Sequence, residues 1–335
     1  MHIDPKREVI KSKGGRIGLV LLIIVVLLAL FAPLITTSDP LAQTVNSFQS
    51  PSWEHPLGTN HAGQDIWSQL VYGARTSLLV GLLVAVLSTA LAAIIGASAA
   101  MIGGIYDKVI MRLVDAFIVI PMIILLILLS VYVDPNLGDG AVIGIVSLIA
   151  IVMVIISVYM IRRLGWVGLA IVGPVIVLIL VSRDLLPSTS GLIIILSLLC
   201  WQGGARTLRA QALSLKEKSH IAATKGFGAS IWYILGRHII PDMGPLLLAN
   251  FIFSLRRAVF LQAGLAFLGI GDPNVVSWGS MISDARDWIF LDVWQWWLIP
   301  AGVALSLTIV AITLIGWALE PALDPRLRGE LNAQG

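Results

Sequence analysis

Long runs of apolar residues without a charge dominate this sequence. Seven such runs hold 18 to 31 residues each: 17–35, 76–106, 116–133, 140–161, 164–182, 185–205 and 293–319. An eighth run, 243–271, is interrupted near its middle by Arg256 and Arg257. A helix rises about 1.5 Å per residue, so roughly 20 residues cross a hydrocarbon core of about 30 Å. The pattern therefore predicts an all-α polytopic membrane protein with eight spans.

The composition supports this class and excludes others. Hydrophobic residues make up 58% of the 335 residues and charged residues only 12%, whereas a soluble domain usually carries about 25% charged residues. The runs are continuous rather than alternating, which excludes a porin-like barrel. The single cysteine, Cys200, excludes an internal disulfide and a cysteine-based metal site, and the five histidines show no metal-ligand spacing.

The distribution of basic residues predicts the orientation. Lys and Arg collect in cytoplasmic loops. When both termini are placed in the cytoplasm, 17 of the 22 basic residues fall inside, three outside and two within the membrane. The basic segment before the first run could also begin a secretory signal peptide. A run of 19 residues without a following Ala-x-Ala site favours a retained helix instead.

These boundaries divide the chain into five parts. They are a basic cytoplasmic N-terminus (1–16), a first transmembrane helix (17–35), an extracytoplasmic loop (36–75), a main transmembrane domain (76–319) and a cytoplasmic tail (320–335). No polar segment is as large as an ordinary domain. No Gly-x-x-x-x-Gly-Lys-Ser/Thr loop occurs, so if ATP energises this protein, another chain must bind it.

The inner loop 211–242 is the most informative polar segment. It begins as a continuation of the preceding run and then forms a short helix of mixed charge that stops at glycine. A second short helix, 230–240, is expected to end at Pro241, because proline cannot donate the next backbone hydrogen bond. Two short helices joined by Gly226-Phe227-Gly228 make a compact cytoplasmic projection.

Several motifs resemble one known family. Gly228 lies thirteen residues before Pro241, with Ala222-Ala223 upstream, and this spacing resembles the EAA loop of permease subunits of binding-protein-dependent ABC importers. The resemblance is closest to the dipeptide/oligopeptide branch. It extends to further strings in the same order along the chain: 57–65 with 72–78, 111–115 with Pro121, 267–271, 277–279 and 324–328.

The resemblance implies a six-helix permease core, to which residues 140–184 add an inserted hairpin of two helices. It also implies that the inner loop contains a coupling helix that seats in an ATPase subunit. The coupling residues would be Lys216, Ala222, Ala223, Lys225, Phe227, Gly228 and Pro241. The family glutamate of this loop falls on Ala222, so docking would rely on shape and apolar contact rather than on an ion pair.

The resemblance further implies the partners and the absence of an enzyme site. We expect a second permease subunit, two ATP-binding subunits that hold ATP and Mg²⁺, an extracytoplasmic solute-binding protein and membrane lipid as partners. Nucleic acid is not expected, and the chain itself would bind no cofactor. Peptides are the expected substrate, with oligosaccharides or nickel as alternatives. Two other classes remain as less favoured alternatives. A secondary transporter would need intramembrane carboxylates, and the only acid near a span is Asp115. A membrane-embedded hydrolase would need a catalytic pair at membrane depth, and all five histidines lie outside the runs.

Charges and small residues within the runs supply the remaining candidates. Arg256 and Arg257 lie deep in their run and, with Gln262, are candidates for the translocation path. Asp115 lies only about 9 Å past the inner boundary and is expected to be interfacial. Four glycines, Gly81, Gly96, Gly103 and Gly104, are expected to allow close helix packing. Four tryptophans, Trp288, Trp294, Trp296 and Trp297, are expected to form an interfacial belt or to contact a binding protein.

Overall fold

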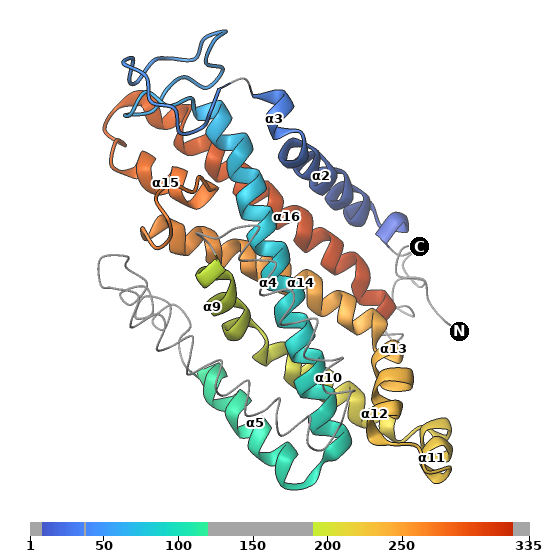
Figure 1. The fold of residues 1–335 in the computed structure, drawn as a ribbon. Helices are drawn as coiled ribbons and strands as arrows, with labels where there is room; N and C mark the ends of the chain where they lie inside the picture. The colour runs from blue at the N-terminus through green and yellow to red at the C-terminus, as the bar shows by residue number, and fades with distance from the viewer. Residues whose placement is uncertain (1–8, 37, 120–189, 324–335) are drawn as a thin grey trace. The chain divides into compact units, whose positions relative to one another are not determined.

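The computed structural model describes residues 9–36, 38–119 and 190–323, which form helices joined by turns and loops (Figure 1). Apart from one isolated bridge between Thr59 and Asp65, these residues contain no β-structure. The helices are α2 (Lys13–Leu30), α3 (Ala32–Ile35), α4 (Ile66–Ile102), α5 (Gly104–Val119), α9 (Ser190–Cys200), α10 (Gln202–Lys216), α11 (Ser219–Gly226), α12 (Ile231–Ile234), the π-helix η3 (Leu235–Ile239), α13 (Ile240–Asp242), α14 (Gly244–Phe267), α15 (Trp278–Arg286), the 3-10 helix η4 (Asp292–Gln295) and α16 (Leu298–Leu323).

Four of the described helical segments are long and apolar enough to cross a membrane: α2, α4, α14 and the stretch Asp292–Glu320 that contains α16. The pair α9 and α10 makes a fifth candidate, bent by 43° at a break. The described residues thus bear out the all-α class and account for up to five of the eight predicted spans. The predicted runs 140–161 and 164–182, and residues 120–133 of a third, lie outside the described residues.

The predicted run 185–205 is not one straight helix. Its described part is broken at Trp201, and Gly203 and Gly204 follow the break. Kinks form readily at small residues, because these do not fill the space that a bend closes. A Cβ on Gly204 would lie 2.4 Å from Oδ1 of Asn250, so a larger residue here would require the Asn250 side chain to move.

Helix α4 begins at Ile66 rather than at Thr76, where the uncharged run begins. Asp65 caps the first turn: its Oδ2 accepts hydrogen bonds from the backbone N–H of Ser68 at 2.9 Å and from the Ser68 hydroxyl at 2.6 Å. An aspartate before the first turn satisfies backbone donors that have no partner within the helix. The helix therefore extends into residues that hydropathy alone assigned to a loop.

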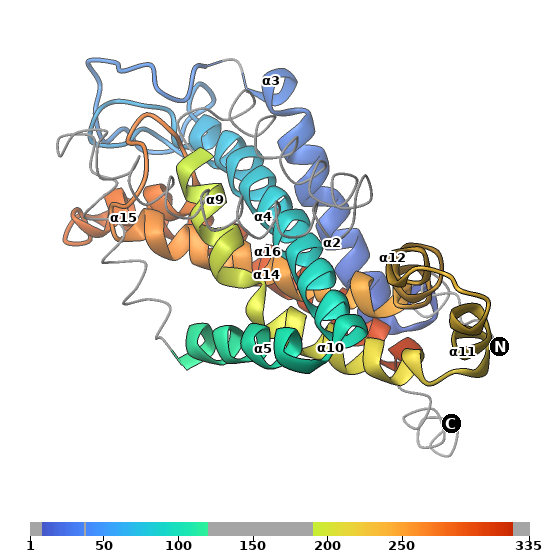
Figure 2. The ribbon, with the colours of Figure 1, turned by 60° about the horizontal axis from the view of Figure 1, so that its bottom comes forward.

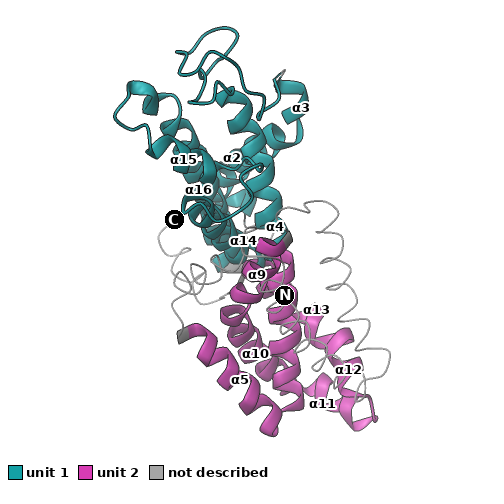
Figure 3. Cartoon of the chain, turned by 60° about the vertical axis from the view of Figure 1, so that its left-hand side comes forward, with its two compact units in different colours: residues 1–85, 251–335 teal, residues 86–250 magenta. Residues whose placement is uncertain are grey.

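The chain forms two compact units (Figure 3). Residues 1–85 and 251–335 make the first unit, and residues 86–250 make the second. In the first unit, α2 runs along α16 (Figure 1). A Cβ on Gly15 would lie 2.8 Å from Cβ of Ala318, and one on Gly18 would lie 2.7 Å from the carbonyl oxygen of Ala311. Small residues let two apolar helices approach closely in this way.

The motif Ser277-Trp278-Gly279 positions α15 in the first unit. Ser277 caps the helix through reciprocal hydrogen bonds with Ser280. The indole Nε1 of Trp278, a fully buried residue, donates to the carbonyl oxygen of Leu70 at 3.0 Å. A Cβ on Gly279 would lie 2.3 Å from the carbonyl oxygen of Ala263. This motif therefore has a structural role, which is to attach α15 to α4 and α14.

The motif 57–65 is a tight turn that precedes α4. Oδ1 of Asn60 accepts hydrogen bonds from the backbone N–H groups of Ala62 and Gln64, both at 2.9 Å. The turn places His61 beside Trp288 and Trp297, whose ring centroids each lie 5.7 Å from the imidazole. Trp297 is fully buried within the first unit. The predicted interfacial belt is therefore wrong for Trp297, which packs against protein.

Close glycine packing is confirmed at two of the four predicted positions. A Cβ on Gly81 would lie 2.5 Å from Cγ2 of Val259, and one on Gly96 would lie 2.4 Å from the carbonyl oxygen of Ala205. The prediction is wrong for Gly103 and Gly104, where a Cβ would meet nothing within 4 Å. Both have positive φ, +70° and +63°, so these two residues turn the chain between α4 and α5.

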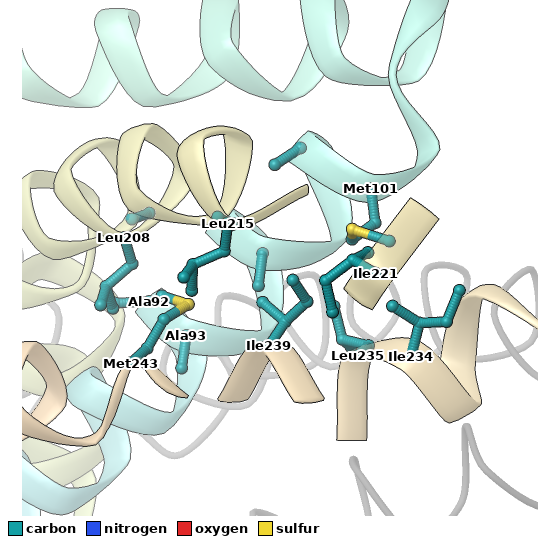
Figure 4. Packing of buried hydrophobic residues seen from close by; sticks show 14 of the residues in the cluster. Ala92, Ala93, Met101, Leu208, Leu215, Ile221, Ile234, Leu235, Ile239 and Met243 are labelled. Carbon is teal, nitrogen blue, oxygen red and sulfur yellow. The ribbon is translucent and has the colours of Figure 1, made fainter. Parts of the chain in front are cut away.

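The core of the second unit joins α4, α10 and the helices after α10 (Figure 4). Buried side chains from three parts of this unit contact one another. They include Ala92, Ala93 and Met101 of α4, Leu208 and Leu215 of α10, and Ile221, Ile234, Leu235, Ile239 and Met243 from the segment that follows. This core ties the inner loop to two long helices.

Candidate functional site

Residues 217–242, which contain α11, α12, η3 and α13, form a small helical unit that we call the projection. The predicted loop began at residue 211, but residues 211–216 belong to α10. Ile221 is the buried residue of α11 and is 2% exposed. It packs in the core of the second unit with Met101 and Leu215 (Figure 4). One apolar side chain thus anchors α11.

The opposite surface of α11 is exposed. Ala222, Ala223 and Lys225 are all exposed, and the side chain of Phe227 is 91% exposed. Covering an exposed aromatic side chain with a partner protein is favourable, because it removes apolar surface from water. The predicted coupling residues of α11 and its C-cap therefore form one accessible surface, while Ile221 points into the core.

Gly228 terminates α11 in the conformation that its motif suggested. Its φ is +82°, its N–H donates to the carbonyl oxygen of Lys225 at 3.0 Å, and the N–H of Ala229 donates to that of Thr224 at 3.3 Å. This pair of bonds is a Schellman motif, in which a left-handed residue satisfies the last carbonyl groups of a helix. A Cβ on Gly228 would meet nothing within 4 Å, so backbone conformation and not space requires glycine.

Pro241 does not end the second helix of the projection, contrary to the sequence prediction. The chain continues from α12 through η3 into α13, which contains Pro241 in its first turn. The π-helical residues before the proline widen the helix. A wider turn removes the clash of the proline ring with the carbonyl group four residues earlier, and the first turn needs no backbone donor at that position.

Lys216 stabilises a helix end within the second unit. Its Nζ donates to the carbonyl oxygens of Ala100 at 2.9 Å and Met101 at 3.2 Å. These carbonyl groups belong to the last turn of α4, which ends at Ile102, where a cation is favoured by the helix dipole. Lys216 thus joins the end of α10 to the end of α4.

Asp242 holds the two ends of the projection together. Its Oδ2 lies 3.9 Å from Nζ of Lys218 and 3.8 Å from Nε2 of His220. The imidazole of His220 also lies 6.2 Å from that of His238, measured between ring centroids. These half-exposed groups connect the beginning of α11 to α13.

The three path candidates lie on α14, in its part that belongs to the first unit. Arg256 is partly buried, and its guanidinium lies 5.6 Å from the ring centroid of Phe253. Arg257 is exposed, which agrees with the different directions expected for successive helix residues. Gln262 is 4% exposed, and its Oε1 accepts no hydrogen bond from any described residue.

Comparison with known proteins assigns the family. Residues 159–329 match the family described as the binding-protein-dependent transport system inner membrane component. The chain belongs to this family. Residues 7–51 also match the N-terminal transmembrane domain of oligopeptide transport permease C. The chain is therefore a membrane component of a binding-protein-dependent transport system, in agreement with its long apolar helices.

Individual relatives cover almost the whole chain. A putative peptide transport system permease protein of Brucella suis is 36% identical over 326 residues, which are 97% of this chain and 92% of the relative. A putative peptide permease protein of the same species is 32% identical over 326 residues, 96% of this chain and 90% of the relative. The dipeptide transport system permease protein of Bacillus subtilis is 27% identical over 327 residues, 97% of this chain and 86% of the relative.

Sequence reasoning missed the residues that attach the projection and α10 to the rest of this permease. Ile221 anchors α11 in the core. The sequence could have indicated it, because it is the large apolar residue between charged positions. Arg209 donates to both carboxylate oxygens of Asp107 at 2.5 Å, and Arg206 pairs with Asp115. No local signal identifies these ion pairs, because about a hundred residues separate the partners.

Proposed function

We propose that this chain forms one half of the translocation path of an ATP-driven ABC importer for peptides. Its relatives include a putative peptide transport system permease and a dipeptide transport system permease, and this similarity supports a peptide substrate here. A second permease subunit would form the other half of the path. A solute-binding protein outside the membrane would deliver the peptide.

The proposal includes an orientation in the cell membrane. Both termini and the projection would be cytoplasmic, because basic residues are enriched there. The chain contains no phosphate-binding loop, so ATP and Mg²⁺ would bind to two partner ATPase subunits. Since an ATPase subunit works in the cytoplasm, the projection is the part of this permease that it could reach.

The observation that carries the proposal is the two-sided geometry of α11. Ala222, Ala223 and Phe227 form an accessible surface, and Ile221 inserts into a core shared with α4 and α10. An ATPase subunit that binds the outer surface and moves would displace α11, and Ile221 and Lys216 would pass this movement to the long helices. Docking through apolar contact rather than an ion pair would depend only weakly on salt.

The test is ATP hydrolysis by the assembled transporter in vesicles, with and without the loaded solute-binding protein. Phe227→Ala should lower the affinity for the ATPase subunits roughly 30-fold, since an exposed aromatic anchor contributes about 2 kcal/mol to such an interface. Ile221→Ala should leave hydrolysis by the assembled complex in place but reduce its stimulation by the binding protein.

Phe31→Ala is the matched control, because it removes a half-exposed phenylalanine outside the projection. If Phe227→Ala assembles and transports like the unchanged protein, the coupling role of this surface is wrong. Calorimetry of the solute-binding protein with a peptide, an oligosaccharide and Ni²⁺ tests the substrate class separately.

A second part of the proposal concerns Arg256 and Arg257, at the middle of α14. A charge at this depth is unfavourable by several kcal/mol when it faces lipid, so such residues usually face a polar interior. One guanidinium would line the path and attract the carboxylate of a peptide, and the buried amide of Gln262 would supply a polar contact about one and a half turns further along the helix.

Single replacements separate the two arginines. We expect Arg256→Leu and Arg257→Leu to assemble and to keep basal ATP hydrolysis, while one of them reduces peptide uptake at least tenfold, which corresponds to the loss of about 1.4 kcal/mol of favourable interaction. Uptake of radiolabelled dipeptide into vesicles measures the effect. Normal uptake by both variants, or loss of assembly in both, would contradict a path role.

A further inference from the structure

In the second unit, α5 lies beside α10 (Figure 2). This side of α5 contains a charged hollow. It is lined by Asp107, Lys108, Met111, Arg112, Asp115 and Arg209. The two acidic residues are already compensated by α10. Asp107 accepts two hydrogen bonds from Arg209, and Asp115 pairs with Arg206. Since each carboxylate is already paired with an arginine of α10, little negative charge is left to balance other cations of the hollow.

Lys108 and Arg112 supply the remaining positive charge. Both side chains are exposed, and neither forms an ion pair with any residue in the described ranges. They lie four residues apart, so they occupy neighbouring turns on one side of α5. Among the described residues, no acidic side chain pairs with these two cations at the rim of the hollow, which favours an anionic ligand.

Apolar side chains lie directly beside these cations. Ile105, Val109, Leu113 and Phe117 follow one another at intervals of four residues and are 80%, 52%, 48% and 37% exposed. This interval places them along one stripe of the helix. A stripe of this kind favours acyl chains, and a small hydrated anion such as free phosphate would gain nothing from it.

The position of α5 in the chain puts the hollow near the membrane surface. α4 is a candidate span that ends at Ile102, and Gly103 and Gly104 reverse the chain. Lys108 and Arg112 lie about 6 and 12 Å along α5 from this turn. The headgroup layer is about 5 to 7 Å thick on each side, and long basic side chains can extend back to it.

We infer that this part of α5 is a binding site for an anionic phospholipid. Lys108 and Arg112 contact the phosphate group, and the acyl chains lie along the stripe from Ile105 to Phe117. Arg206 and Arg209 support the site by compensating the charges of Asp107 and Asp115, which line the same hollow. The inference depends on the membrane location of the chain and not on the transported substrate.

Lipid titration of the full-length chain, co-purified in detergent with its partner subunits, tests the inference. Phosphatidylglycerol is the anionic probe and phosphatidylcholine the neutral one, and native mass spectrometry counts the bound molecules. We expect the unchanged protein to retain phosphatidylglycerol preferentially. The double variant K108Q/R112Q should bind it roughly 30-fold more weakly, given the usual contribution of a basic residue near an anionic surface.

Two further variants make the result specific. K13Q/R16Q removes two exposed basic residues at the beginning of α2 and should retain the lipid. K108R/R112K keeps both charges and should also retain it. If K108Q/R112Q does not assemble, the single variants K108Q and R112Q, each expected to bind about fivefold more weakly, provide the same test.

Three results would overturn the inference. Equal losses in K108Q/R112Q and K13Q/R16Q would show attraction by total charge only. Unchanged retention in K108Q/R112Q would show that protein covers this face. Full displacement of phosphatidylglycerol by an equal concentration of inorganic phosphate would show a site for small anions rather than for a lipid.

Discussion

Individual residues in the projection have separate structural and contact roles. Ile221 is buried and Phe227 is almost fully exposed, although both belong to the segment that the motif marks. Gly228 contributes neither contact nor burial, and its role is a backbone conformation with φ of +82°. A motif of this kind therefore combines residues that are required for different physical reasons.

Gly228 gives a prediction at this scale. Gly228→Val forces a β-branched residue into the left-handed region, which costs about 1–2 kcal/mol or more, and should displace Phe227 and abolish stimulation of ATP hydrolysis. Gly226→Ala is the control, because Gly226 is helical, has open space around it and tolerates alanine. Full stimulation of ATP hydrolysis in Gly228→Val would show that the left-handed conformation at the end of α11 is not required for coupling.

At the scale of elements, α15 is attached to its unit by one short motif. Ser277 caps it, Trp278 enters the core, and Gly279 permits close approach to Ala263. The same logic applies to α10, whose Lys216 binds the carbonyl groups at the end of α4. In both cases a polar group at a helix end fixes the position of an apolar helix, because apolar packing alone has little directionality.

Trp278→Phe tests this attachment. Phenylalanine keeps most of the buried ring but leaves the carbonyl oxygen of Leu70 without its donor, which should cost about 1–3 kcal/mol. We expect a lower apparent melting temperature of the detergent-purified protein. Trp53→Phe should leave it unchanged, since Trp53 is fully exposed. Equal melting temperatures for the two variants would show that the hydrogen bond from the indole N–H to Leu70 does not stabilise the protein.

At the scale of the whole molecule, the orientation and the hairpin predicted at 140–184 are open to a direct test. The hairpin tip, Arg162-Arg163, is predicted to be cytoplasmic because a basic pair separates two uncharged runs. Arg162→Cys should resist a membrane-impermeant thiol reagent in sealed right-side-out vesicles and react after permeabilisation. Trp53→Cys should react in both states. Labelling of Arg162→Cys in sealed vesicles would show that the tip lies outside and that the predicted orientation of the hairpin is wrong.

The sequence by itself determined the helical membrane class, the motifs of the permease family and the end of a short helix at the glycines of the inner loop. These are local properties: the transfer free energy of a run of side chains, and the steric freedom of one residue. It also indicated close packing at Gly81 and Gly96, but it could not separate these from Gly103 and Gly104, which lie in the same apolar run and turn the chain instead.

The tertiary structure alone decided which distant residues meet. Hydropathy does not specify that Arg209 pairs with Asp107, that Lys216 caps α4, or that Trp297 packs beside His61. It also does not specify the bend at Trp201 or the passage of a helix through Pro241. The ion pairs and ring contacts depend on segments far apart in the chain and exist only after the helices have packed. The bend and the π-helical turn depend on local backbone geometry, which the hydropathy of the run does not encode.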